Sequence, residues 1–206
     1  MTGATDPDAG PGPGNGAGPE SGPTARGAKG GLLTELPGEL VLWVLIISEL
    51  AVFGAGLLVF LVLRLLDPAL FAQSQDHLHR AAAGLNTVVL VSSGFCAARA
   101  LHVVGQAMRC RAWLAAAIAL GGVFLALKAV EYADAIGQGI GIDSNRFFTF
   151  YFLLTGFHAA HVLAGMLILA LVAIRPSRNG VQAGAQFWHM VDLVWVLLFP
   201  VIYLLR

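Results

Sequence analysis

The chain has 206 residues, of which 57% are hydrophobic and only 12% are charged, and its formal net charge is zero. Because an ordinary soluble domain contains about 25% charged residues, this chain has too few charges to cover a water-exposed surface. The composition excludes a nucleic-acid-binding protein, which needs a basic face, and two cysteines form neither a disulfide framework nor a zinc cluster. We therefore predict an integral membrane protein.

The first 37 residues differ in composition from the rest of the chain. Ten of the 25 glycines and six of the nine prolines fall there. Such a segment has too little apolar surface to offset the entropy that it would lose on ordering. We predict a disordered tail over residues 1–37, without the basic start and apolar run of a secretory signal, and a membrane domain over residues 38–206.

Five apolar runs follow the tail, near residues 40–63, 81–105, 112–133, 147–174 and 187–205. Each run can cross the hydrocarbon layer as a helix, and none shows the alternation that is typical of a membrane-barrel strand. The short connections between the runs favour antiparallel packing of successive helices. The sequence thus predicts an all-α membrane bundle of five transmembrane helices.

Lysine and arginine are unevenly distributed between the two ends of these spans. The end that carries the tail has six of them, and the opposite end has four. Because cytoplasmic loops carry the excess of positive charge, we expect the N-terminus to be cytoplasmic.

Several polar side chains lie inside the predicted spans, where each would cost about 2–3 kcal/mol if it faced lipid. We expect all of them to face the bundle interior or a water-filled crevice. Three pairs have the i, i+3 spacing that places both members on one helix face. The residues are Glu49, Asn86, Lys128, Glu131, His158, His161, His189 and Asp192.

Glu49 differs from the other acids because no cation lies within four residues of it on the same helix. Either another helix supplies a partner or the carboxyl group is protonated. Glu49 is therefore our candidate for proton handling, with a plain interhelical hydrogen bond as the alternative.

The three pairs have structural interpretations that we favour over chemical ones. Lys128 can neutralise Glu131, and the carboxylate of Asp192 can orient the ring of His189. His158 and His161 could bind one metal, but a bis-histidine haem needs rings on opposite sides, so we favour hydrogen bonds across helices and expect no metal site.

Aromatic residues near the ends of the last run are typical of anchors at the membrane interface, and we assign Trp188, Trp195 and Tyr203 to that role. Pro200 is expected to kink the last turns of the same helix.

Two segments resemble signatures of the cytochrome c oxidase subunit III family. They are residues 155–162, TGFHAAHV, and residues 187–195, FWHMVDLVW. Shorter matches follow the same order along the chain at Ser48-Glu49, Asn86-Thr87 and Glu131-Tyr132, so the resemblance covers residues 38–206. Within the family, residues 36–39 and 187–190 resemble NorE-type proteins, which are linked to nitric oxide reductase and denitrification.

The resemblance implies an accessory, non-haem subunit in a bacterial inner (plasma) membrane. Such a subunit supports proton supply, stability or assembly of a catalytic haem-containing subunit, in either a haem-copper oxidase or a nitric oxide reductase. It also implies that haem and copper belong to the partner, that this chain binds structural lipids but no cofactor, and that Glu49 matches the family's carbodiimide-reactive acid.

Two other functions remain open on the residues alone. A small membrane cytochrome could use His158 or His161 as a haem ligand. A proton-conducting transporter could use Glu49, although the sequence shows neither an inverted repeat nor a pair of broken helices.

Overall fold

The structure, a computed structural model, describes residues 36–205, so that all of the predicted tail except Leu36 and Pro37 lies outside the described residues. Five of its helices are long and apolar enough to cross a membrane. They are α1 (Leu36–Leu66), α3 (Arg80–His102), α4 (Ala107–Gly137), α5 (Arg146–Ile174) and α6 (Arg178–Phe199), which continues into a π-helix, η1 (Pro200–Leu204). The prediction of an all-α bundle with five transmembrane helices is confirmed.

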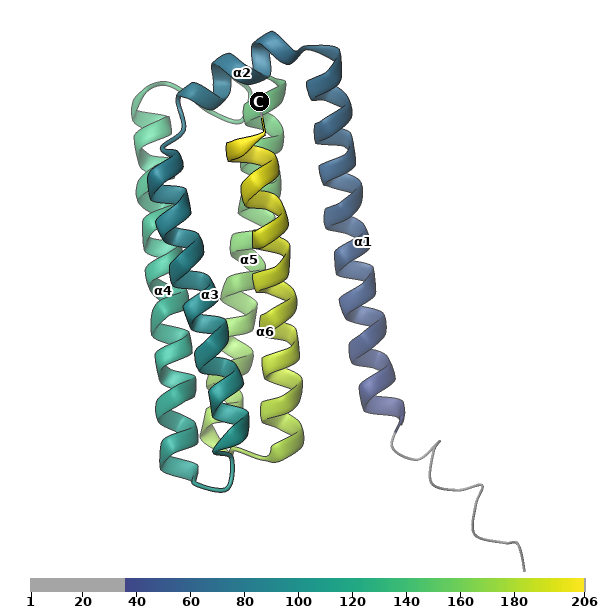
Figure 1. Ribbon diagram of the computed structural model, residues 1–206, viewed down its shortest axis with the longest axis vertical. Helices are drawn as coiled ribbons and strands as arrows, with labels where there is room; N and C mark the ends of the chain where they lie inside the picture. Colours follow the sequence, from purple (N-terminus) through teal and green to yellow (C-terminus); the bar gives the residue numbers. More distant parts are fainter. Residues whose placement is uncertain (1–35, 206) are drawn as a thin grey trace, which may run out of the picture. The chain divides into compact units, whose positions relative to one another are not determined.

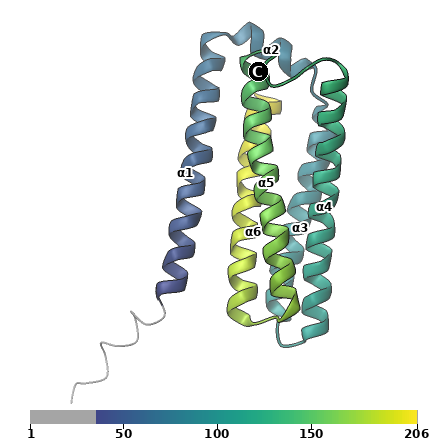
Figure 2. The same ribbon diagram turned by 180° about the vertical axis from the view of Figure 1, so that it is seen from behind.

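Four of the long helices form an antiparallel bundle, in which α3 packs against α4, α4 against α5, α5 against α6, and α6 against α3 (Figure 1). The backbone of α1 stands apart from this bundle in both views (Figures 1 and 2). Side chains connect α1 to α5: the rings of Phe53 and Phe157 lie 5.1 Å apart. Gly56 admits Leu154 so closely that a Cβ at Gly56 would lie 2.6 Å from Leu154 Cδ2. These contacts form a seam between α1 and α5.

A short helix, α2 (Pro68–Asp76), replaces the loop that we expected between the first two spans. The Asp67 side chain accepts a hydrogen bond from the backbone N–H of Leu70 (3.2 Å), and Pro68 occupies the first turn. Both features stabilise a helix N-terminus. The ring of Phe71 lies 5.1 Å from that of Phe60 on α1. The short helix is therefore stabilised both by its N-cap and by packing against α1.

The C-terminal end of the chain is held by the connection between α1 and α3. Gln75 on α2 donates through Nε2 to the carbonyl oxygens of Ile202 (2.7 Å) and Leu205 (2.8 Å). The guanidinium of Arg64 donates to the carbonyl oxygen of Leu205 as well. Where we expected Pro200 to kink an α-helix, the helix changes to π-helical hydrogen bonding. The helix ends at Leu204, and the carbonyl groups at a helix C-terminus have no partner within the helix, so Gln75 can bind them.

The last span begins nine residues earlier than predicted, at Arg178 instead of residue 187. The Ser177 side chain accepts a hydrogen bond from the backbone N–H of Gly180 (3.1 Å), which caps the helix there. Residues 178–186 are too polar to register as part of an apolar run, although their buried positions, such as Val181 and Ala185, face the bundle.

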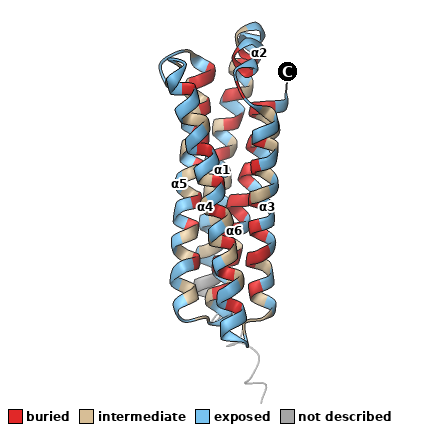
Figure 3. Cartoon of the chain, turned by 90° about the vertical axis from the view of Figure 1, so that its left-hand side faces the viewer, coloured by how far each residue is buried: buried red, intermediate tan, exposed pale blue. Residues whose placement is uncertain are grey.

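Buried side chains follow the inward faces of the helices, and exposed residues cover the outward faces (Figure 3). The assignment of Trp188, Trp195 and Tyr203 to the membrane interface is wrong, because all three are at most 1% exposed. Trp188 fills a notch between two glycines: a Cβ at Gly121 or Gly165 would lie 2.8 or 2.7 Å from its ring atoms. Such small residues let helices approach closely around a large ring.

Candidate functional site

Glu49 on α1 and His161 on α5 meet across the seam between these helices. The carboxylate Oε2 lies 3.0 Å from the imidazole Nε2, and the side chains are 26% and 15% exposed. The other ring nitrogen, Nδ1, lies 2.9 Å from the carbonyl oxygen of Phe157. Because a carbonyl oxygen only accepts, Nδ1 carries a proton. A hydrogen bond between Nε2 and Oε2 then requires one further proton, bound either to the ring or to the carboxyl group.

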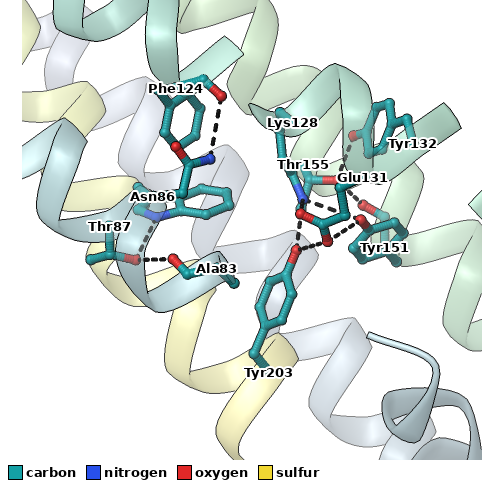
Figure 4. A network of polar contacts seen from close by, with 11 residues as sticks. Ala83, Asn86, Thr87, Phe124, Lys128, Glu131, Tyr132, Tyr151, Thr155 and Tyr203 are labelled. Atoms are coloured by element: carbon teal, nitrogen blue, oxygen red, sulfur yellow. Dashed lines mark hydrogen bonds and ion pairs between the residues drawn. The ribbon is translucent and has the colours of Figure 1, made fainter. Parts of the chain in front are cut away.

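The second polar cluster joins α4, α5 and η1 (Figure 4). It lies at the end of the bundle where α6 continues into η1. Lys128 donates through Nζ to Glu131 Oε2 (3.0 Å), Tyr151 Oη (3.1 Å) and Tyr203 Oη (2.6 Å). Both tyrosine hydroxyls in turn donate to Glu131 Oε1, at 2.7 and 2.6 Å. Every donor of the ammonium group is used, and one carboxylate neutralises its charge.

This Lys128 cluster is shielded from the hydrocarbon by aromatic rings. The ammonium group lies 4.8 Å from the ring centroid of Tyr151 and 5.4 Å from that of Trp195. Ring faces attract a cation electrostatically and add to the ion pair. The cluster therefore serves to bind three elements together, and the buried charge is compensated within the chain.

Asn86 on α3 supports the same region from the opposite side (Figure 4). Its Nδ2 donates to the carbonyl oxygen of Phe124 on α4 at 3.3 Å. The neighbouring Thr87 accepts a hydrogen bond from the indole nitrogen of Trp195 at 2.9 Å. Asn86 thus connects helices, as expected of an amide inside a membrane bundle.

His158 lies one turn from His161 but in a different environment. It is fully buried, and its ring stacks on that of Trp195 with centroids 5.1 Å apart. Neither ring nitrogen has a hydrogen-bond partner among the described residues. The expectation that both histidines bond across helices therefore describes His161 and is wrong for His158, whose contacts are aromatic.

His189 and Asp192 lie together on α6, beside Gly94 of α3. Nδ1 of His189 is 3.7 Å from Oδ2 of Asp192, which is the distance of an ion pair and is too long for a hydrogen bond. The carboxylate occupies the space where Gly94 would carry a Cβ. Asp192 is buried as expected, whereas His189 departs from the expectation of a buried ring with 48% of its side chain exposed.

Sequence reasoning missed three residues of these sites. Tyr151 has no signal in the sequence, and our assignment of Tyr203 to the interface is wrong. Phe53, whose ring lies 5.4 Å from that of His161, falls within the first apolar run, where nothing distinguishes it. A buried lysine has three N–H donors, and one acid does not use all of them. The unused donors were the one sign in the sequence that other acceptors, such as hydroxyl groups, had to lie near Lys128.

Comparisons with known proteins show which family the chain resembles. The family model for cytochrome c oxidase subunit III matches residues 75–206. Cytochrome c oxidase subunit 3 of Corynebacterium diphtheriae is 35% identical over 65% of this chain and 70% of the relative. The subunits of the same name from Synechocystis sp. and Thermostichus vulcanus are 31% and 30% identical, over 78% and 81% of this chain and 72% and 86% of the relatives.

Proposed function

Because the chain belongs to the cytochrome c oxidase subunit III family, we propose that it is an accessory membrane subunit of a haem-copper oxidase. Its task is to support the proton supply and the integrity of a catalytic subunit that carries the haem and copper. We assign no cofactor to this chain, and we place it in a bacterial plasma membrane with the N-terminus in the cytoplasm.

The hydrogen bond between Glu49 and His161 carries this proposal. The charged groups of the Lys128 cluster are each held by several contacts within the chain. The pair at the seam of α1 and α5 is different, since it contains a proton with two possible positions and both side chains remain partly exposed. Such a pair can move its proton from one partner to the other without leaving a charge unpaired.

The experiment that tests the proposal is purification of the full-length chain through an affinity tag in mild detergent. We expect a haem-bearing subunit, identified by mass spectrometry, to co-purify and to show a Soret band that the chain alone lacks. Absence of any haem-bearing subunit from the purified material would contradict the accessory role. Stoichiometric haem on the chain alone would instead favour a small membrane cytochrome.

The gas reduced by the partner is a finer question. The relatives reported above bear the name of cytochrome c oxidase subunits, which favours oxygen. The similarity of residues 187–190 to NorE-type proteins keeps nitric oxide as the alternative. Oxygen and nitric oxide consumption by the purified complex separates the two, since only one should proceed at a substantial rate.

A further inference from the structure

One face of α6 carries a row of polar side chains in its first half. Gln182, Gln186 and His189 follow one another at spacings of four and three residues, so they lie on one helix face. The two glutamines are half-buried, and the ring of His189 is exposed. In the part of the chain that the structure describes, neither amide has a hydrogen-bond partner. We call these three residues the α6 polar stripe.

The α6 polar stripe extends from the membrane surface to the middle of the membrane. With a rise of 1.5 Å per residue, His189 lies about 16 Å along the helix from Arg178, which begins α6. The hydrocarbon layer is about 30 Å thick, so His189 is close to its centre. Acyl chains offer no hydrogen bonds, and amide groups facing them would remain unsatisfied.

Exposed positions on the other helices of the bundle are mostly apolar. On α4 these include Val123 and Val130, and on α5 Leu163 and Leu167 are exposed. The exposed Ser92 on α3 donates to the carbonyl oxygen of Val88 in its own helix, so it needs no external partner. The exposed residues of these surfaces are mostly apolar, whereas the α6 polar stripe is made of hydrogen-bonding side chains. Such a composition is typical of a surface that contacts another protein helix.

The helices of the described chain cover the stripe only in part, since both glutamines are half-buried and 48% of the His189 side chain is exposed. His189 lies on the side of α6 that faces α3, since a Cβ at Gly94 would be 3.4 Å from its Nδ1. The contacts of α1 described above are made with α5, through Glu49 and Phe53. The part of the stripe that stays exposed is therefore open to an occupant from outside the described residues.

We propose that the α6 polar stripe is the surface that binds a transmembrane helix of the catalytic subunit. The occupant presents uncharged side chains that both donate and accept hydrogen bonds, such as Ser, Thr, Asn or Gln, because primary amides offer both functions and carry no charge. A lipid headgroup remains at the membrane surface and reaches Arg178 but not His189. This inference rests on the proposed function, since it names the face by which an accessory subunit associates.

Photocrosslinking in the intact complex tests the contact directly. A photoreactive amino acid is placed at Gln186, and in a matched control at Val123 on the apolar face of α4. We expect the probe at Gln186 to crosslink to the haem-bearing subunit, as identified by mass spectrometry, and the probe at Val123 not to do so. Crosslinks from Gln186 to lipid alone, or equal crosslinks from both positions, would overturn the proposal.

A double variant, Gln182→Leu with Gln186→Leu, measures the contribution of the amides. It leaves the contact between His189 and Asp192 in place and makes the span more apolar, so membrane insertion should not suffer. Loss of two interhelical hydrogen bonds should lower the haem recovered per chain about tenfold, equivalent to about 1.4 kcal/mol of association free energy.

The controls separate this proposal from the proposed function. Val123→Leu with Val130→Leu should leave the recovered haem unchanged. If the unaltered chain recovers no haem-bearing subunit, the accessory role itself fails. If the unaltered chain recovers it and the Gln182, Gln186 double variant recovers as much, only the docking surface is refuted.

Discussion

The carboxylate of Glu49 and the imidazole of His161 share one proton. Nδ1 of the ring donates to the carbonyl oxygen of Phe157, so the 3.0 Å contact between Nε2 and Oε2 can form only with a proton from one of the two partners. The pair can be an imidazolium with a carboxylate, or a neutral imidazole with a carboxylic acid. Both forms have the same net charge, which suits a partly buried site.

Replacing Glu49 by glutamine should separate hydrogen bonding from proton transfer. The amide of Glu49→Gln can donate to Nε2 of a neutral His161, so the chain should accumulate and assemble normally. It holds no transferable proton, and we expect turnover of the complex to fall or its inactivation to accelerate. Gas consumption over many turnovers measures both quantities.

The neighbouring residue provides the control for this variant. Ser48 donates only to the carbonyl oxygen of Leu45 in its own helix, and Ser48→Ala should leave turnover unchanged. Normal turnover and a normal inactivation rate in Glu49→Gln would remove the proton-handling role and leave Glu49 as an interhelical contact.

Removing the lysine of the Lys128 cluster should be strongly destabilising. In Lys128→Met the Glu131 carboxylate keeps its two tyrosine donors but loses its counter-charge, and such a loss costs about 3–5 kcal/mol. The double variant Lys128→Met with Glu131→Gln removes both charges and should recover much of this loss. Thermal unfolding of the purified complex in detergent measures the difference, and equal stability of the single and double variants would show that charge compensation is unimportant here.

Adding one methyl group at Gly165 should disturb the packing of Trp188. The new Cβ would lie 2.7 Å from the indole ring, and overpacking of this kind costs about 1–3 kcal/mol. Gly54→Ala on α1 is the matched control, since no atom lies within 4 Å of the Cβ position there. We expect a lower unfolding temperature for Gly165→Ala only. An unchanged temperature would mean that α5 and α6 can move apart to admit the methyl group without loss of stability.

The hydrogen bonds of Gln75 should secure the C-terminal π-helix. Gln75→Ala removes two bonds to backbone carbonyls, each worth about 1 kcal/mol. Gln73, two residues earlier in α2, is exposed, so Gln73→Ala changes composition equally without breaking a buried contact. Hydrogen exchange at residues 200–205 should accelerate in the first variant and not in the second. Equal exchange in both variants would mean that other contacts stabilise η1, for instance the hydrogen bond from Arg64 to Leu205.

Two helical segments could not be predicted from the sequence, namely the first two turns of α6 and the helix α2. The five spans were visible because hydrocarbon selects long apolar runs. The first two turns of α6 were missed because Gln182 and Gln186 lower the local hydropathy, although the cap at Ser177 begins the helix before them. The helix α2 was missed because nine residues form a stable helix only with tertiary support, here from Phe71 against Phe60.

The sequence by itself determined two features: its composition predicts a membrane protein, and its five apolar runs predict five spanning helices, since the hydrocarbon layer admits few alternatives to helices. Its motifs also pointed to the family. Only the tertiary structure decided which polar groups meet: Glu49 and His161 are 112 residues apart, and Lys128 reaches Tyr203 across 75 residues. Periodicity places a side chain on a helix face, but the rotation and packing of the helices determine which face it meets.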